Sequence, residues 1–98
     1  MNEDIKILEK KALYGNKFIN LLDSEQWKLL DEEIFKPLDR SAFETFKKVE
    51  PSDVNGIIEA QMISKVIDKI KLEINIKINE GVFAKNQLKV MAEEIGDD

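Results

Sequence analysis

The side chains that could carry out catalysis are few in this sequence, and nothing in their spacing brings them together. There is no histidine, the residue best suited to proton transfer near neutral pH, and no cysteine to act as a thiolate. A serine nucleophile would need another base, and no lysine is arranged to activate Ser24, Ser41, Ser52 or Ser64. We therefore expect that the protein is not an enzyme.

Metal and cofactor sites are equally poorly supported. The acidic pairs Glu32-Glu33 and Glu93-Glu94 are neighbours in sequence, so on a helix their carboxylates diverge by about 100°. The glycines lack the spacing of a phosphate-binding loop, and Asp23-Ser24-Glu25 lacks the ligand periodicity of a calcium loop. The sequence predicts no metal ion and no cofactor.

The charge balance disfavours nucleic acid as a partner. The chain has fifteen basic and twenty acidic residues, which gives a formal net charge of −5. Arg40 is the only arginine, and the doubled lysines Lys10-Lys11 and Lys47-Lys48 have no aromatic residues between them to stack on bases. The N-terminus does not resemble a signal peptide, and no apolar run approaches the roughly 20 residues that span a bilayer. We expect neither secretion through a signal peptide nor a membrane as a partner.

The length of 98 residues fits a single helical domain over 1–98. A first helix is predicted over about 3–22, because apolar residues recur there at spacings of three and four. Gly15 lies on this apolar face. It marks either a close approach of another backbone or a bend, and the bend is the preferred interpretation.

A second helix is predicted over about 24–49. Asp23 with Gln26 forms a capping-box pattern at its start, and Ser24 is the alternative cap. Pro37 lacks a backbone N–H and disfavours helical geometry at Lys36, so a kink is expected there.

A long third helix, over about 52–80, is the element around which the others should pack. Its seam residues fall on one side of a helical wheel: Ile63, Ile67, Ile70, Ile74 and Ile78. A strand over Leu72–Ile78 is the competing interpretation, because apolar residues alternate there. Gly81 is expected to end the helix, and a last helix follows over about 83–95.

The predicted fold class is all-α, with three to four helices. The kinked second helix should pair antiparallel with the long third helix, as a helical hairpin or small bundle. Ile58, Leu72 and Ile76 lie on the side of the third helix opposite its seam, so they are candidate interface residues. Trp27 and Phe35 join them because aromatic residues often dominate binding, although filling the core is their more ordinary role.

One resemblance adds to this picture. Leu-Leu-Asp-Ser-Glu-Gln-Trp-Lys (Leu21–Lys28), the break at Pro51-Ser52-Asp53 and the isoleucine-rich helix ending in Asn79-Glu80-Gly81 resemble small helical proteins of unassigned function encoded by tailed bacteriophages. The resemblance covers roughly residues 17–81 and implies an accessory structural or assembly role in a phage particle. It also implies a location in the virion or the host cytoplasm. We expect a protein partner, either a second copy in a homo-oligomer or a larger phage structural protein. The alternative is a phage-encoded regulator or inhibitor that binds a host protein.

Overall fold

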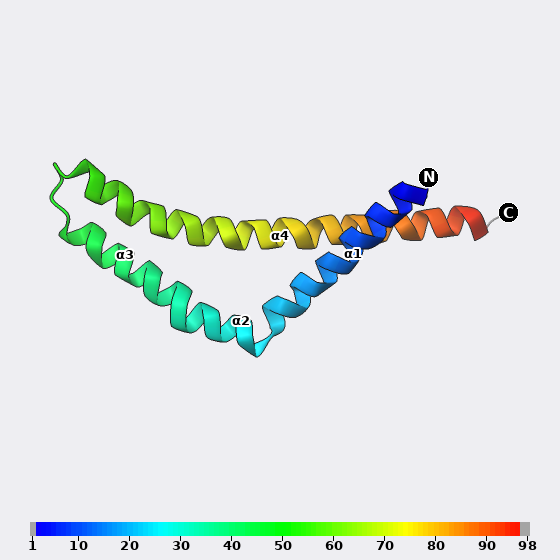
Figure 1. Ribbon diagram of the computed structural model, residues 1–98, viewed down its shortest axis with the longest axis horizontal. Coiled ribbons are helices and arrows are strands. Elements are labelled where there is room, and N and C mark those ends of the chain that lie inside the picture. Colours follow the sequence, from blue (N-terminus) through cyan, green and yellow to red (C-terminus); the bar gives the residue numbers. More distant parts are fainter. Residues whose placement is uncertain (1, 97–98) are drawn as a thin grey trace. The chain divides into compact units, whose positions relative to one another are not determined.

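The computed structural model of the chain is all-α, which confirms the predicted fold class. It describes residues 2–96, and within that range it contains no strand. Its elements are α1 (Asn2–Asp23), α2 (Glu25–Leu30), the π-helical turn η1 (Asp31–Phe35), α3 (Lys36–Lys48) and α4 (Val54–Gly96) (Figure 1). The alternating stretch Leu72–Ile78 is helical, so the strand interpretation is wrong.

The elements form two compact units, where the length alone predicted one domain. The hairpin unit comprises residues 24–72, which contain α2, η1, α3 and the first part of α4. The α1 unit combines α1 with the part of α4 from Glu73 onward. The two units share α4 as one uninterrupted helix.

Two side-chain caps begin the helices of the hairpin unit. The Ser24 hydroxyl accepts a hydrogen bond from the Trp27 N–H at 3.1 Å, so Ser24 is the cap of α2 and the capping box on Asp23 is not used. The Asp53 carboxylate accepts from the Gly56 N–H at 3.0 Å and caps α4. This cap places the start of α4 at Val54, two residues after the predicted start.

Pro37 is accommodated by a π-helical turn. The Lys36 N–H donates to the Asp31 carbonyl, five residues back, and Pro37 then lies in the first turn of α3. Inside a helix, a proline would leave a hydrogen bond unmade and its ring would clash with the carbonyl four residues back. The first turn of a helix avoids both problems, so a proline fits there. The interruption predicted near Pro37 takes the form of this wider turn.

The π turn also changes which residues share a face. Along an unbroken α-helix, Trp27 and Asp39 would lie about 120° apart, at about 100° per residue. One extra residue in the turn reduces this angle to about 20°. Both residues are accordingly half-buried on the side of the hairpin that packs against α4.

Gly81 does not end the long helix, contrary to the prediction. α4 continues through it to Gly96, so the separate last helix over 83–95 is also wrong. No described glycine has a positive φ, which means that Gly81 is helical and forms no left-handed cap. Its role is to allow close packing, because α1 crosses α4 at this point.

Gly15 is the matching residue on α1. A Cβ atom added to Gly15 would lie 2.7 Å from the Cα of Gly81, and a Cβ added to Gly81 would lie 2.7 Å from the Cα of Gly15. Both glycines are buried, and α1 is continuous from Asn2 to Asp23. The expected bend at Gly15 is therefore wrong, and the close approach of another backbone is what the structure shows.

The buried side of α4 differs from the predicted seam. Every seventh residue from Ala60 is buried: Ala60, Ile67, Ile74 and Gly81. Ile63 and Ile70, predicted to lie in the seam, are exposed by 41% and 40%. The contact line is rotated away from them, because the polar residues Ser64 and Lys71 occupy its other flank and are half-buried. A wheel that counts only apolar residues misses that flank.

Candidate functional site

The strongest candidate site is an apolar surface on the hairpin unit, which we call the apolar patch. Its residues come from η1, α3 and one side of α4: Phe35, Leu38, Met62, Ile63, Val66 and Ile70. The side chains of Met62 and Val66 are exposed by 56% and 54%. Lys65 and Lys69 border the patch along α4. The patch is a shallow hydrophobic surface with a basic edge.

The small size of the core leaves these side chains uncovered. Among the described residues, the buried apolar side chains are those of Ala42, Ala60, Ile67, Ile74 and Ala84. Three of these five are alanines, so the helices approach closely while the large side chains stay at the margins. Fully covering one Val, Ile or Met side chain is worth about 1.5–3 kcal/mol. A partner that covered the patch would gain this contribution from several side chains at once.

Two polar pairs set the register of the hairpin under the patch. The Lys71 ammonium lies 2.9 Å from the Asp31 carboxylate, and the Ser64 hydroxyl donates a hydrogen bond to the Asp39 carboxylate. Going forward from Asp31 to Asp39, the partners run backward from Lys71 to Ser64, so the two helical arms of the hairpin are antiparallel. Polar residues at such seam positions specify register, because a shifted pairing would leave them without partners.

Asp31 is the residue whose ionisation the structure perturbs. The hydrogen bond from Lys71 lowers the pKa of its carboxyl group below the ordinary value of 3.8, and the nearby charges of Lys71 and Lys36 act in the same direction. Lys36 lies 3.8 Å from the second carboxylate oxygen. The Asp31 side chain is 22% exposed, so the pair lies at the edge of the seam rather than in a dry interior. Its role is structural.

The aromatic candidates Trp27 and Phe35 pack against each other. Their ring centroids are 5.6 Å apart and the rings are inclined at 65°, which is the edge-to-face arrangement. The Lys71 ammonium lies 5.8 Å from the Phe35 centroid, so Phe35 also contacts the register pair. Both rings are half-buried, and Phe35 lines the apolar patch. Phe35 therefore belongs to the interior and to the exposed patch.

The other predicted interface residues are exposed on α4. The exposed fractions are 46% for Ile58, 52% for Leu72 and 37% for Ile76. They lie outside the apolar patch, whose residues in α4 begin at Met62 and end at Ile70. Sequence reasoning missed Met62 and Val66. Both are apolar residues that lie beside the predicted seam. A search of the sequence for large apolar residues next to Ile63 and Ile70 on the helical wheel could have found them.

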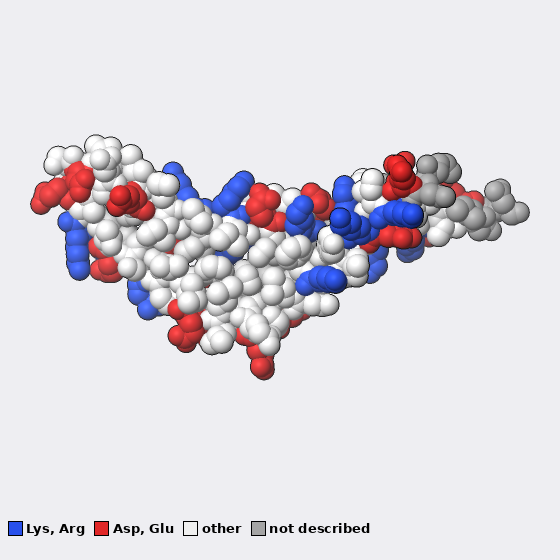
Figure 2. Space-filling model, viewed as in Figure 1, with Lys and Arg blue, Asp and Glu red and all other residues white. Residues whose placement is uncertain are grey.

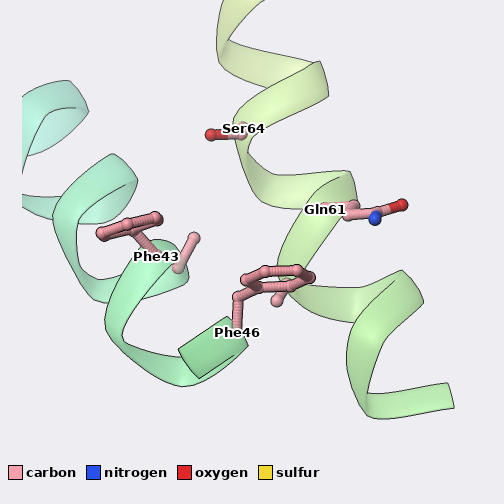
Figure 3. A pocket seen from close by; sticks show the side chains of 6 residues that line it. Phe43, Phe46, Gln61 and Ser64 are labelled. Carbon is pink, nitrogen blue, oxygen red and sulfur yellow. The ribbon is translucent and has the colours of Figure 1, made fainter. Parts of the chain in front are cut away.

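A shallow pocket lies where α3 meets the start of α4 (Figure 3). Ala42 and Ala60 form its small-residue floor, and Phe46 reaches across toward α4. Ser64 points toward α3, whereas Gln61 is turned away from it. Because the Ser64 hydroxyl is bonded to Asp39 and the chain has no histidine, the pocket lacks an activated nucleophile.

The described part of the chain offers no metal centre: no three acidic, histidine or cysteine residues gather there in an arrangement that could hold an ion. Among the described helices, none combines the length and apolar character needed to cross a membrane. Comparisons of the chain with protein-family models, with curated proteins and with solved structures gave no match. The function must therefore be inferred from the surfaces of the molecule.

Proposed function

We propose that this chain is a non-enzymatic helical module that binds another protein through the apolar patch. The observation that carries this proposal is the exposure of Met62, Val66 and Ile70 on one face of a hairpin whose register is fixed by polar pairs. Large apolar side chains grouped on a rigid helical face are typical of protein-binding surfaces. The basic edge formed with Lys65 adds a preference for a partner that is acidic around an apolar centre.

The partner that we propose is a larger structural protein of a tailed phage particle. This part of the proposal is supported by the resemblance of residues 17–81 to small helical phage proteins. In this role the chain would be an accessory structural or assembly component, present in the particle in many copies. Its activity would be to bind and cover a surface of that larger structural protein.

The experiment replaces one residue of the patch and follows incorporation into particles. Val66→Lys places a charge at the centre of the patch, and Val90→Lys is its matched control on the same helix, because Val90 is exposed by 47%. We expect Val66→Lys to reduce the copies per particle by about tenfold or more, since an unpaired charge opposes burial. Val90→Lys should leave the copy number unchanged. Equal copy numbers for both variants would contradict the proposed binding surface.

The second candidate function is a regulator that binds and blocks a host protein, and the observation that favours it is the net charge of −5. An acidic surface can steer a small protein toward a basic site. The two functions differ in where the chain ends up. A regulator is absent from purified particles and is found in a one-to-one complex in the infected cell.

A further inference from the structure

A second surface, in the α1 unit, has a different chemistry from the apolar patch. α1 and α4 form a groove there, which we call the lysine groove. Apolar and aromatic residues of α1 supply part of its lining: Ile7, Tyr14 and Phe18. Charged residues of both helices supply the rest: Lys10, Lys11, Lys77 and Glu80. Lysine side chains gather over α1 and the adjoining part of α4 (Figure 2).

The contact between Gly15 and Gly81 holds two of these lysines beside the crossing of the helices. Lys11 lies one helical turn before Gly15, and Lys77 lies one turn before Gly81. A Cβ added to Gly81 would lie 2.9 Å from the Lys11 carbonyl oxygen, and a Cβ added to Gly15 would lie 3.3 Å from that of Lys77. The backbone that carries both lysines is therefore fixed by the closest contact in the α1 unit.

The lysines differ in how much of their charge is already matched. Glu80 is the one acidic residue in the lining, and its carboxylate lies 3.7 Å from the ammonium of Lys77. Lys10 and Lys11 are exposed, and within the described part of the chain neither forms an ion pair. These two lysines offer the groove's positive charge to a ligand.

The ring of Tyr14 is already in use. The ammonium groups of Lys10 and Lys17 lie 5.5 and 5.7 Å from its centroid, within the range of cation–π attraction. Single-stranded nucleic acid is bound by stacking its bases on aromatic rings, and here lysines lie over the ring instead. The contacts of Tyr14 therefore favour a ligand without bases.

The positive charge covers a limited length of α1. Between Lys6 and Lys17 this helix has four lysines and one glutamate. Exposed acidic residues flank that stretch, with Glu3 and Asp4 before it and Asp23 after it. An anionic membrane laid against the unit would also meet these carboxylates. A short ligand that stays between them would not.

The length of the groove fits a short segment of polypeptide. Ile7 and Phe18 are eleven residues apart on one helix, a distance of about 16 Å at 1.5 Å per residue. An extended chain spans this distance with about five residues. The lysines are spread along it, so a ligand with several spaced charges engages them better than a single anionic group does.

We propose that the lysine groove binds a short acidic segment of a partner protein, in which carboxylates flank an apolar side chain. The carboxylates pair with Lys10 and Lys11, and the apolar side chain covers Ile7, which is 52% exposed. Complementary charge selects this partner and speeds its approach, while the apolar contact adds affinity. The proposal uses a different unit from the apolar patch and stands independently of the proposed function.

The test uses the full chain and a fluorescently labelled synthetic peptide that has four glutamates around one phenylalanine. Fluorescence anisotropy should show saturable binding at low salt, with the dissociation constant about tenfold or more higher at high salt. A peptide with glutamines in place of the glutamates should bind about tenfold or more weakly. A peptide with serine in place of the phenylalanine should bind about fivefold or more weakly, because the apolar contact is lost.

Two double variants locate the binding site. Lys10→Gln with Lys11→Gln should weaken peptide binding by about tenfold or more. The matched control is Lys47→Gln with Lys48→Gln, which removes the other pair of adjacent lysines. Both control positions are exposed on α3, and the Lys47 ammonium also lies near an aromatic ring, 4.5 Å from the centroid of Phe43. The control should bind the peptide like the unchanged chain, and circular dichroism checks that both variants keep their helical content.

Anionic lipid vesicles and a single-stranded DNA oligonucleotide serve as competing polyanions. Each should bind the unchanged chain more weakly than the acidic peptide does. The proposal is overturned by tighter binding of either one, or by the absence of saturable peptide binding at low salt. It is also overturned by equal losses in the two double variants, or by a glutamine peptide that binds as well as the acidic one.

Discussion

Gly15 and Gly81 lie against each other where α1 crosses α4, and neither position has room for a Cβ atom. The nearest obstacles to such an atom are backbone atoms: the Cα of the opposite glycine, the carbonyl oxygen of Lys77 on one side and that of Lys11 on the other. Backbone cannot move aside as a flexible side chain can. The α1 unit therefore depends on this pair for its close packing, and Ala84, which is fully buried, continues the same small-residue surface.

Gly81→Ala should destabilise the protein even though alanine is the better helix former. Alanine gains up to about 1 kcal/mol in helix propensity over glycine, so a net loss can come only from the contact with Gly15. We expect the free energy of unfolding to fall by about 1–3 kcal/mol, the usual cost of overpacking, as measured by urea denaturation. Asn79→Ala, at an exposed position of the same helix, is the control and should leave stability the same or slightly higher. A more stable Gly81→Ala variant would contradict the close crossing.

Ser64→Ala should weaken the hairpin unit through the loss of one hydrogen bond. The Ser64 hydroxyl donates to the Asp39 carboxylate, and bonds to charged groups contribute about 1.5–3 kcal/mol when well protected. Because Asp39 is only half-buried, we expect a loss of about 1–2 kcal/mol in the free energy of unfolding. Ser41→Ala, on the exposed side of α3, supplies the comparison. Equal losses of unfolding free energy for Ser64→Ala and Ser41→Ala would contradict the role of Ser64 in setting the register of the hairpin.

The ion pair between Asp31 and Lys71 predicts a dependence of stability on acid. The pKa of the Asp31 carboxyl group is lowered in the folded state, so its contribution is fully present above its ordinary pKa of 3.8. The contribution is lost as the pH falls from about 3.8 through the lower folded value. Asp31→Asn removes this carboxyl group. The free energy of unfolding should therefore fall less steeply between pH 4 and pH 2 than it does for the unchanged chain. Glu32→Gln removes a neighbouring carboxyl outside this ion pair, and a profile identical to that of Asp31→Asn would contradict the assignment.

Deleting Glu33 should convert the π turn into a regular α-helix and leave the preceding residues on the same face, because the deletion removes the one residue that the wider turn absorbs. Trp27 and Asp39 would then be eleven residues apart on an unbroken α-helix, again at an angle of about 20°. Trp27 should therefore keep its edge-to-face contact with Phe35. Because Trp27 is the only tryptophan, its fluorescence reports on this contact, and we expect the emission to stay unchanged. A shift of the emission to longer wavelength, with helical content unchanged, would show that the π turn does not set the phase of the hairpin.

Much of the fold was accessible from the sequence, because it depends on local patterns. Apolar spacing predicted the helices, and the break at Pro51-Ser52-Asp53 predicted the turn of the hairpin. The errors arose where tertiary contact decides. A glycine after Asn79-Glu80 is typical of a helix end. Only the presence of α1 beside Gly81 favours the continuation of α4 through this residue. Nothing in the sequence around Gly15 identifies Gly81 as its neighbour.

The candidate site was harder to predict for a related reason. A helical wheel centres on the isoleucines, whereas the structure leaves Ser64 and Lys71 half-buried in the seam and exposes Ile63 and Ile70. Those two polar residues lie in the seam because Asp39 and Asp31 face them across the hairpin. The alignment of these partners depends on the extra residue in the π turn. A small error in the predicted phase of α4 therefore assigned Ile70 to the seam, although the structure places it on the surface.

Quantitative mass spectrometry of purified phage particles tests the central claim most directly, with the unchanged chain, Val66→Lys and Val90→Lys produced in parallel. Circular dichroism of the three purified chains confirms that all remain folded. The unchanged chain and Val90→Lys should be present in many copies per particle, and Val66→Lys should be reduced by about tenfold or more. The absence of the unchanged chain from the particles would contradict the structural role. Full incorporation of Val66→Lys would contradict the apolar patch as the surface that binds.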